Sequence, residues 1–152
     1  VGITPPTTIA TSKVFINEIA PRPQVGVCAG TPNGANANSG EWIELYNAGI
    51  DNVDLSGWIV SDGDWTATIP AGTTLVANGY YLIGGGGTFC SVGVLPDLNI
   101  ETCNCATVAL GSDLMNLTDG NEQVALFDCS GNFIDGVLDS LLYLAHTWVA
   151  NR

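Results

Sequence analysis

Short β-rich runs separated by turn residues recur along most of this 152-residue chain, and they constrain its fold more than any other feature. The runs are KVFINEIA (13–20), EWIELYN (41–47), VDLSGWIVSD (53–62), WTATIP (65–70), TTLVANGYYLIG (73–84), EQVALFD (122–128) and FIDGVLD (133–139). Gly, Pro, Asn and Asp fall between them, and the last two runs flank the turn CSGN, as in a hairpin. Strands that follow one another roughly every 8–12 residues are typical of a β-sandwich. The length is enough for one such domain with a core of its own.

The first twelve residues, VGITPPTTIATS, differ from the runs that follow them. They carry no charged side chain, and Pro5-Pro6 excludes a helix and disfavours a central strand. We therefore expect residues 1–12 to form an extended N-terminal arm and residues 13–152 to form the β-sandwich domain. The tail SLLYLAHTWVA (140–150) fits both helical spacing and a strand, so the sequence leaves its conformation open.

The charge of the chain is strongly one-sided. The formal net charge is −12, and the three basic residues are Lys13, Arg22 and Arg152. Residues 41–151 hold 14 acidic residues and no Lys or Arg. Because no basic patch can neutralise phosphates, the composition argues against binding to nucleic acid or to an anionic membrane surface. The chain also lacks an apolar run of 18 residues, so we expect no membrane insertion. An acidic body of this kind would accept cations or a basic segment of a neighbour.

Five cysteines point to an oxidising compartment. They are Cys28, Cys90, Cys103, Cys105 and Cys129. Together with few lysines and many Thr, Asn and Gly residues, they favour a protein with disulfides that is secreted or displayed at the cell surface. A zinc site is the rival interpretation, but Cys103-x-Cys105 lacks the usual ligand spacing, and His146 is distant in sequence. Cys103 and Cys105 would share one face of a strand, so we expect Cys90 to pair with one of them. The fifth thiol would be buried or would bridge subunits.

Four motifs along the chain resemble those of a known family. They are VFINEIAP, EWIELYNAGIDNVDLSGWIVSDG, IPAGTTLVANGYYLIG and LTDGNEQVALFDCSGNFIDGV. Together they resemble the lamin tail domain in its secreted microbial version, over about residues 13–137, with the cysteine-containing loop 86–113 as an insertion. The resemblance implies an immunoglobulin-like β-sandwich that is non-catalytic and serves in interaction, attachment or assembly. The arm before the first strand and the tail after the last hairpin depart from the family pattern.

Two glutamates beside aromatic residues, Glu41 and Glu44, form the most suggestive catalytic pattern. Side chains alternate along a strand, so these carboxylates point apart and cannot flank one glycosidic bond unless a bulge intervenes. Ile43 and Leu45 would face the core, with Glu44 on the outer side. His146 lies in the apolar tail, and no serine sits in a G-x-S-x-G motif. We therefore expect no catalytic residues and no enzymatic activity.

Closely spaced oxygen ligands in loops make calcium the candidate cation. The clusters are Asp62 and Asp64 in SDGDW, Asp51 and Asp54 in DNVD, and Asp119, Asn121 and Glu122 in TDGNE. The competing interpretation, which we favour for each cluster, is turn chemistry, because Asp and Asn cap turns and tolerate their backbone angles. Asp62 and Asp64 are the candidate metal ligands if a site exists. Asn116-Leu117-Thr118 is an N-glycosylation sequon, which matters only in a source that glycosylates.

The uncharged arm suggests what the domain does. Its Ile3, Thr7, Thr8 and Ile9 could add as a strand to the open sheet edge of a neighbour. Head-to-tail donation that does not close produces filaments. We therefore predict a non-catalytic extracellular structural protein, a self-assembling subunit of a surface filament or layer joined by N-terminal strand donation. A disordered terminus, or one packed on its own domain, is the competing interpretation.

A second function class remains open from the sequence. A carbohydrate- or cell-surface-binding module would need exposed coplanar aromatic rings. Trp42, Tyr46, Trp58 and Trp65 are the candidates for such a platform.

Overall fold

The structure, a computed structural model, describes residues 13–20, 42–63, 65–84, 96–100, 107–109, 122–139 and 148–149. For residues 107–109, 122, 137–139 and 148–149 it describes the backbone alone. The described residues form strands and turns and no helix. None of them belongs to a helix with the length and hydrophobicity that a membrane crossing requires.

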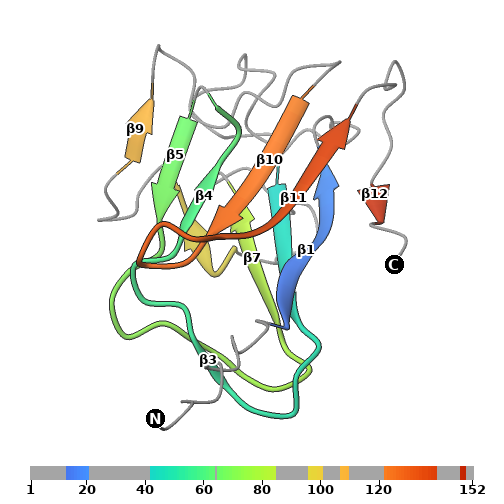
Figure 1. The fold of residues 1–152 in the computed structure, drawn as a ribbon, viewed down its shortest axis with the longest axis vertical. Coiled ribbons are helices and arrows are strands. Elements are labelled where there is room, and N and C mark those ends of the chain that lie inside the picture. Colours follow the sequence, from blue (N-terminus) through green and yellow to red (C-terminus); the bar gives the residue numbers. More distant parts are fainter. Residues whose placement is uncertain are drawn as a thin grey trace, which may run out of the picture.

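Two five-stranded sheets form the two layers of the fold (Figure 1). The first, called the β1 sheet, has the order β12 (Trp148–Val149), β1 (Val14–Ala20), β2 (Trp42–Asn47), β7 (Tyr80–Gly84) and β8 (Leu98–Asn99). The second, called the β10 sheet, has the order β11 (Phe133–Asp139), β10 (Glu122–Phe127), β4 (Ile59–Ser61), β5 (Trp65–Thr68) and β9 (Thr107–Ala109). Two short strands of two residues each, β3 (Val53–Asp54) and β6 (Thr74–Leu75), pair with each other at one end of the fold.

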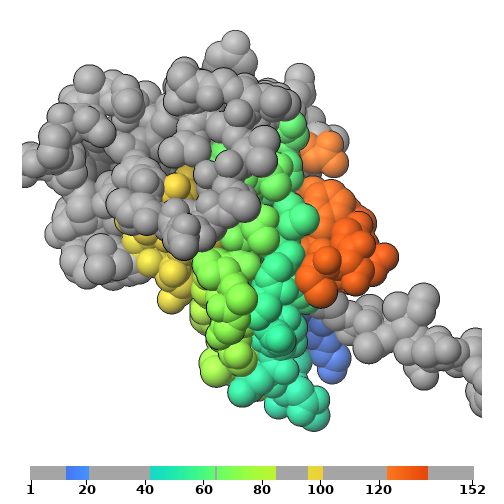
Figure 2. All heavy atoms as spheres, turned by 90° about the vertical axis from the view of Figure 1, so that its left-hand side faces the viewer, coloured from blue at the N-terminus to red at the C-terminus, as the bar shows by residue number. Residues whose placement is uncertain are grey.

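Strand pairing is antiparallel except between β7 and β8, which run parallel. Figure 2 shows β2, β7 and β8 side by side. The fold is all-β and immunoglobulin-like, which confirms the predicted fold class. The arm predicted at residues 1–12 lies outside the described residues. The two residues of β12 show that part of the tail, whose conformation the sequence left open, pairs with β1 as a strand.

Alternating apolar side chains from both sheets fill the space between the layers. Ile43 and Leu45 of β2 are fully buried there, as the alternation predicts, and they belong to one core cluster with Val60 and Leu126 of the other sheet. Burying an aliphatic side chain of this size stabilises the fold by about 1.5–3 kcal/mol. The core therefore fixes which residues of each strand remain on the outer faces.

The run VDLSGWIVSD, predicted as one continuous β segment, is divided by a turn. Trp58 N–H donates to the Leu55 carbonyl, and Gly57 has a positive φ of 75°, a backbone conformation that glycine adopts without strain. The Asp54 carboxylate caps the turn by accepting hydrogen bonds from Ser56 N–H and Oγ. Turn chemistry at Asp54, Ser56 and Gly57 outweighs the β preference of the flanking residues, and β3 and β4 are separate strands.

A hydrogen bond next to a bulge in β1 connects the two sheets. The register of β1 against β2 shifts between Ile16 and Glu18, so Asn17 is the extra residue. Just before this bulge, the Ile16 N–H donates to Asp135 Oδ2 of β11 at 2.9 Å, and both residues are buried. Asp135 therefore satisfies a buried backbone donor that the β1–β2 ladder leaves unpaired.

Candidate functional site

The outer face of the β1 sheet carries two carboxylates directly opposite each other. Glu18 of β1 and Glu44 of β2 are cross-strand partners, and Asn17 Nδ2 donates to Glu44 Oε1 at 2.7 Å. Burial raises the pKa of Glu18 above its ordinary value, and repulsion by Glu44 raises it further. Such a pair favours the uptake of a proton or a cation. Within the described ranges no group of three or more His, Cys, Asp or Glu side chains is arranged to hold a metal ion.

The raised pKa of Glu18 gives a pH-dependent prediction. The folded protein binds this proton more tightly than the unfolded chain, so the stability it contributes is fully present below the unfolded pKa and is lost as pH rises through the folded pKa. We expect Glu18→Gln to stabilise the protein at pH 7 by about 0.2–1 kcal/mol, the usual cost of opposed like charges, and by less at pH 4. Urea unfolding at both pH values measures this, with exposed Asp51→Asn as the control for net charge. An equal effect of Glu18→Gln at both pH values would contradict the prediction.

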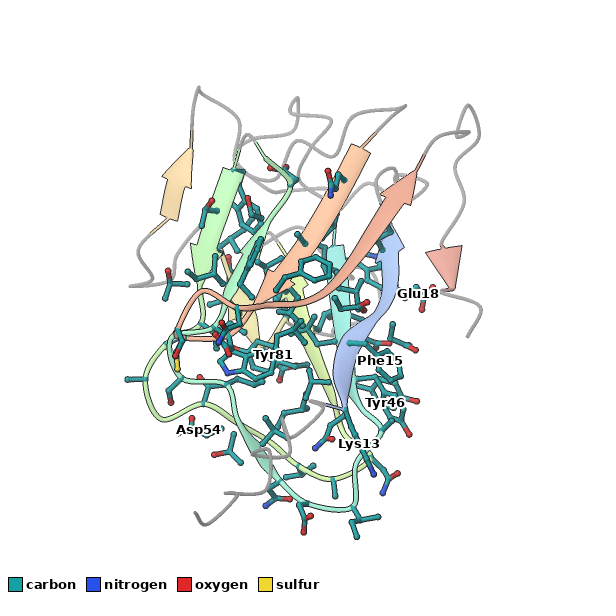
Figure 3. All side chains as sticks on the ribbon, viewed as in Figure 1. Lys13, Phe15, Glu18, Tyr46, Asp54 and Tyr81 are labelled. Atoms are coloured by element: carbon teal, nitrogen blue, oxygen red, sulfur yellow. The ribbon has the colours of Figure 1, made fainter. Side chains whose placement is uncertain are left out.

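An aromatic row lies beside the carboxylate pair on the same face. Phe15, Tyr46 and Tyr80 are neighbours on β1, β2 and β7. The Phe15 and Tyr46 rings meet edge to face at 5.6 Å between centroids, and Tyr46 stacks on Tyr80 at 4.7 Å. Figure 3 shows the Phe15 and Tyr46 rings next to each other beside β1. The next residue of β7, Tyr81, points into the core, where burial raises the pKa of its hydroxyl.

Two loops next to this row, one after β2 and one before β7, carry exposed apolar side chains. The side chain of Asn47, fully buried, donates to the carbonyls of Asp51, Leu75 and Val76 and accepts from Gly49 N–H. Asn47 thus joins the loop after β2 to the loop before β7. Ile50 and Val76, on these two loops, are 82% and 55% exposed, and Tyr80 is 57% exposed. The site is therefore a surface that carries aromatic and apolar side chains and a pair of carboxylates.

The predicted tryptophan platform is wrong. Trp58 and Trp65 belong to the core cluster, and Trp42 is also buried. Trp65 alternates with Thr66 on β5 and takes the inward position, although its Nε1 has no hydrogen-bond partner among the described residues. Only Tyr46 of the four candidates lies on the outer face with partial exposure. The large apolar area of tryptophan favours burial over display, and a sequence without strand register does not reveal the choice.

The candidate calcium ligand Asp62 stabilises a turn by accepting a backbone hydrogen bond. Its Oδ1 accepts a hydrogen bond from Trp65 N–H at 2.6 Å, and the residue is buried. Gly63 follows with a φ of 102°, and its N–H donates to Ser61 Oγ. Asp54 also closes a turn. The hydrogen bonds that it accepts from the side chain and backbone of Ser56 favour its charged form and so lower its pKa. Calcium binding remains a prediction, since Asp64 lies outside the described residues.

The turn between β10 and β11 is also closed by an aspartate. Asp128 accepts hydrogen bonds from the backbone N–H groups of Ser130 and Asn132 and from Asn132 Nδ2, and the bonds from Asn132 lead in lowering its pKa. Cys129, on this turn, is exposed and forms no disulfide in the part of the chain that the structure describes. The other residues singled out from sequence lie outside the described residues: Ile3, Thr7, Thr8, Ile9, Cys28, Glu41, Cys90, Cys103, Cys105, Asn116, Asp119, Asn121 and His146. For Glu122 the backbone alone is described. The predicted disulfides therefore stay a prediction.

Comparison with known protein families shows which family the chain is related to. The family model of the lamin tail domain matches residues 7–139. The chain belongs to the lamin tail domain family. Lamin tail domains are immunoglobulin-like structural domains, generally without enzymatic activity. No curated protein matches the chain.

Sequence reasoning missed several residues that shape this lamin tail domain. Glu18 gave no signal, because its pairing with Glu44 depends on the register of β1 against β2 after the bulge. Phe15 and Tyr80 needed the same register to be placed beside Tyr46. Alternation of apolar and polar residues could have put them on an outer face, but it could not have shown that they are neighbours.

Proposed function

We propose that this lamin tail domain is a structural subunit that assembles with copies of itself outside the cell. Residues 1–12 of one copy would add as a strand to a sheet of the next, in a filament or surface layer. The observation that carries the proposal is the contrast between an uncharged, β-branched arm and a body with a net charge of −12. A charged donor segment of the same acidic character would be repelled, whereas an uncharged one is accepted at no electrostatic cost.

Two further features support assembly. An open sandwich has sheet edges whose backbone groups can pair with another chain. The first basic residue, Lys13, directly follows the arm and is exposed, and it is the one cation among the described residues. Approach of the arm would therefore bring Lys13 to the acidic surface of the neighbouring copy. The extracellular location is supported by the cysteine content alone.

A proline in the arm tests the proposal. We expect Ile9→Pro in the full chain to abolish assembly, because proline removes a backbone donor and disfavours a paired strand. Ile9→Val keeps the β-branched side chain and should assemble normally. Negative-stain electron microscopy and sedimentation measure assembly, and thermal unfolding checks that both variants are folded. Normal filaments from Ile9→Pro would show that the arm does not join the subunits.

The alternative function, carbohydrate binding, has one observation in its favour. The stacked pair of Tyr46 and Tyr80 presents an aromatic surface, with Tyr80 more than half exposed. A glycan array with wild type and Tyr80→Ala tests this alternative. Binding that is lost in the variant would favour it, and absence of binding in wild type would eliminate it.

A further inference from the structure

We infer that two copies of this chain pack face to face through the outer face of the β1 sheet, related by a two-fold axis that runs along the aromatic row. In this dimer Lys13 of each copy meets the carboxylates of Glu18 and Glu44 of the other copy. The contact is separate from the arm and does not rest on the proposed assembly. Its basis is the exposure of the aromatic row, the register of β1 against β2, and the charges on the two sides of the row.

The aromatic row forms one continuous apolar strip at the surface. It crosses β1, β2 and β7, and each ring packs on the next. Tyr80 is 57% exposed, and Phe15 and Tyr46 are partly exposed. Ile50 and Val76, on the two loops next to the row, enlarge this apolar surface. Single apolar side chains on a surface are ordinary, whereas a contiguous group of them marks an interaction surface.

Side chains of opposite charge lie at equal spacing before and after the row. Phe15 and Glu18 lie opposite positions 46 and 44 of β2. The hydrogen bond from Ala48 N–H to the Lys13 carbonyl, at 3.0 Å, continues this pairing, so that Lys13 lies opposite position 48. Each step along β2 is two residues, or about 6.8 Å, and the cation is therefore as far from the row as the carboxylate pair is. Figure 3 shows Lys13, Phe15 and Glu18 in this order along β1.

Alternation and the bulge put these side chains on the same face. Val14 is buried, so Lys13 before it and Phe15 after it face outward. After Phe15, plain alternation would turn Glu18 toward the core. The extra residue Asn17 shifts the register, and Glu18 therefore lies on the outer face, opposite position 44. The bulge thus places the carboxylate pair where a two-fold relation requires it.

The charges on the two sides of the row have no opposite partner within the described part of the chain. Lys13 is exposed and forms no ion pair there, and neither carboxylate of the pair is matched by a cation. Burial raises the pKa of Glu18, and repulsion by Glu44 raises it further. A cation supplied by a second copy would stabilise both carboxylates in their charged form.

A two-fold axis brings these charges together. The axis lies in the plane of the contact, follows the aromatic row and is perpendicular to the strands. Rotation by half a turn about this axis sets each row against the row of the other copy and reverses the strand direction. Because Lys13 and Glu18 are equally far from the row, Lys13 of one copy then faces Glu18 of the other, and the reciprocal contact forms at the same time. Self-complementary contacts of this kind are the commonest in homo-oligomers.

A second copy is the occupant of this face that the observations favour. A foreign basic partner would need the carboxylate pair alone, and the matching position of Lys13 would have no role. On a chain of net charge −12, contact between copies is opposed by like charge. Lys13 is the one cation among the described residues that can offset this repulsion, and it lies beside the exposed aromatic row.

Exchange of charges between two variants tests the dimer. Both variants are made in the full chain that carries Ile9→Pro, so that assembly through the arm does not obscure the measurement. Lys13→Glu and Glu18→Lys should each raise the dissociation constant of the dimer at least about tenfold, because each places like charges together at both ends of the contact. An equimolar mixture of the two should dimerise nearly as well as the chain without them, since both ends again pair opposite charges. Sedimentation equilibrium measures the dissociation constants, and native mass spectrometry with one variant isotopically heavy identifies the mixed dimer.

Matched aromatic substitutions test the centre of the contact. Tyr80 and Phe133 are both aromatic and more than half exposed, but Phe133 lies on the β10 sheet. We expect Tyr80→Ala to raise the dissociation constant about tenfold, as for loss of an interface anchor, and Phe133→Ala to leave it nearly unchanged. Thermal unfolding checks that every variant is folded, and Glu44→Lys replaces Glu18→Lys if the latter does not fold.

Several results would overturn the dimer. One is a chain without charge substitutions that stays monomeric at every concentration that sedimentation reaches. Another is a mixture of Lys13→Glu and Glu18→Lys that does not restore dimerisation, which would contradict the two-fold arrangement. Weakening by Phe133→Ala and not by Tyr80→Ala would place the contact on the β10 sheet. Glycan binding at Tyr80 by a chain that stays monomeric would make a carbohydrate the occupant of this face.

The measurements keep this inference apart from the proposed function. If Ile9→Pro abolishes filaments and no dimer forms, assembly through the arm stands and the face-to-face contact is wrong. If Ile9→Pro still forms filaments, the proposed function is wrong, and the dimer is read from photo-cross-links in a mixture of heavy and light chains with benzoylphenylalanine at position 80. Links to β2 and β7 of another copy would support the dimer, and their absence would overturn it.

Discussion

Asn47→Ala is expected to lower the free energy of unfolding by about 3 kcal/mol, because it leaves buried backbone groups without partners. Asn47 is fully buried, and its hydrogen bonds to Gly49 N–H at 2.9 Å and to the Leu75 carbonyl at 3.2 Å lie in the interior. Alanine fills the space poorly and replaces neither bond. In a domain of this size, 3 kcal/mol corresponds to a decrease in melting temperature of roughly 6–12 °C.

A nearby asparagine provides the matched control. Asn52 is exposed and accepts a single hydrogen bond, from Ala77 N–H at 3.0 Å, between the same two loops. We expect Asn52→Ala to cost about 1 kcal/mol or less, because water can replace an exposed partner. Urea unfolding followed by circular dichroism measures both variants. If the two substitutions lowered the free energy of unfolding equally, the buried hydrogen bonds of Asn47 would not be what holds the two loops together.

The sequence predicted the architecture where local signals agreed with the final packing. Alternation placed Ile43 and Leu45 in the core, and the turn CSGN located the β10–β11 hairpin correctly. These features depend on neighbouring residues and on a period of two, so they are visible without tertiary information. The division of the 53–62 run is an intermediate case, because Gly57 was a visible turn signal that β-rich neighbours obscured.

The outer surface was predicted less well than the core. The prediction of an aromatic platform was wrong because three of its four residues, all tryptophans, are buried. The observed aromatic row joins residues of three strands that are up to 65 positions apart in the sequence. Neighbours on an outer face follow from strand order and register, which the sequence did not supply. Asn47 shows the same limit, since an Asn before a glycine-containing loop resembles an ordinary turn residue until its carbonyl partners are known.

Asp135→Ala is expected to cost about 2 kcal/mol, because it leaves the Ile16 N–H buried without its carboxylate acceptor. The bond joins residues 119 positions apart, and it exists because strand alternation turns the Ile16 N–H away from β2 and toward β11. No local pattern in FIDGV distinguishes this aspartate from the turn aspartates, which is why its role required the structure.

Asp135→Asn separates loss of the acceptor from loss of the charge. Its amide oxygen can still accept from Ile16 N–H, so we expect most of the stability to return, with a cost below about 1 kcal/mol. Hydrogen exchange at the Ile16 amide, together with urea unfolding, distinguishes the variants: the alanine variant should lose protection there and the asparagine variant should keep it. If both variants were equally destabilised, the carboxylate charge and not the hydrogen bond to β1 would be what the fold requires. If Asp135→Ala were neutral, the Ile16 N–H must find another partner, and the connection between β1 and β11 would not depend on this side chain.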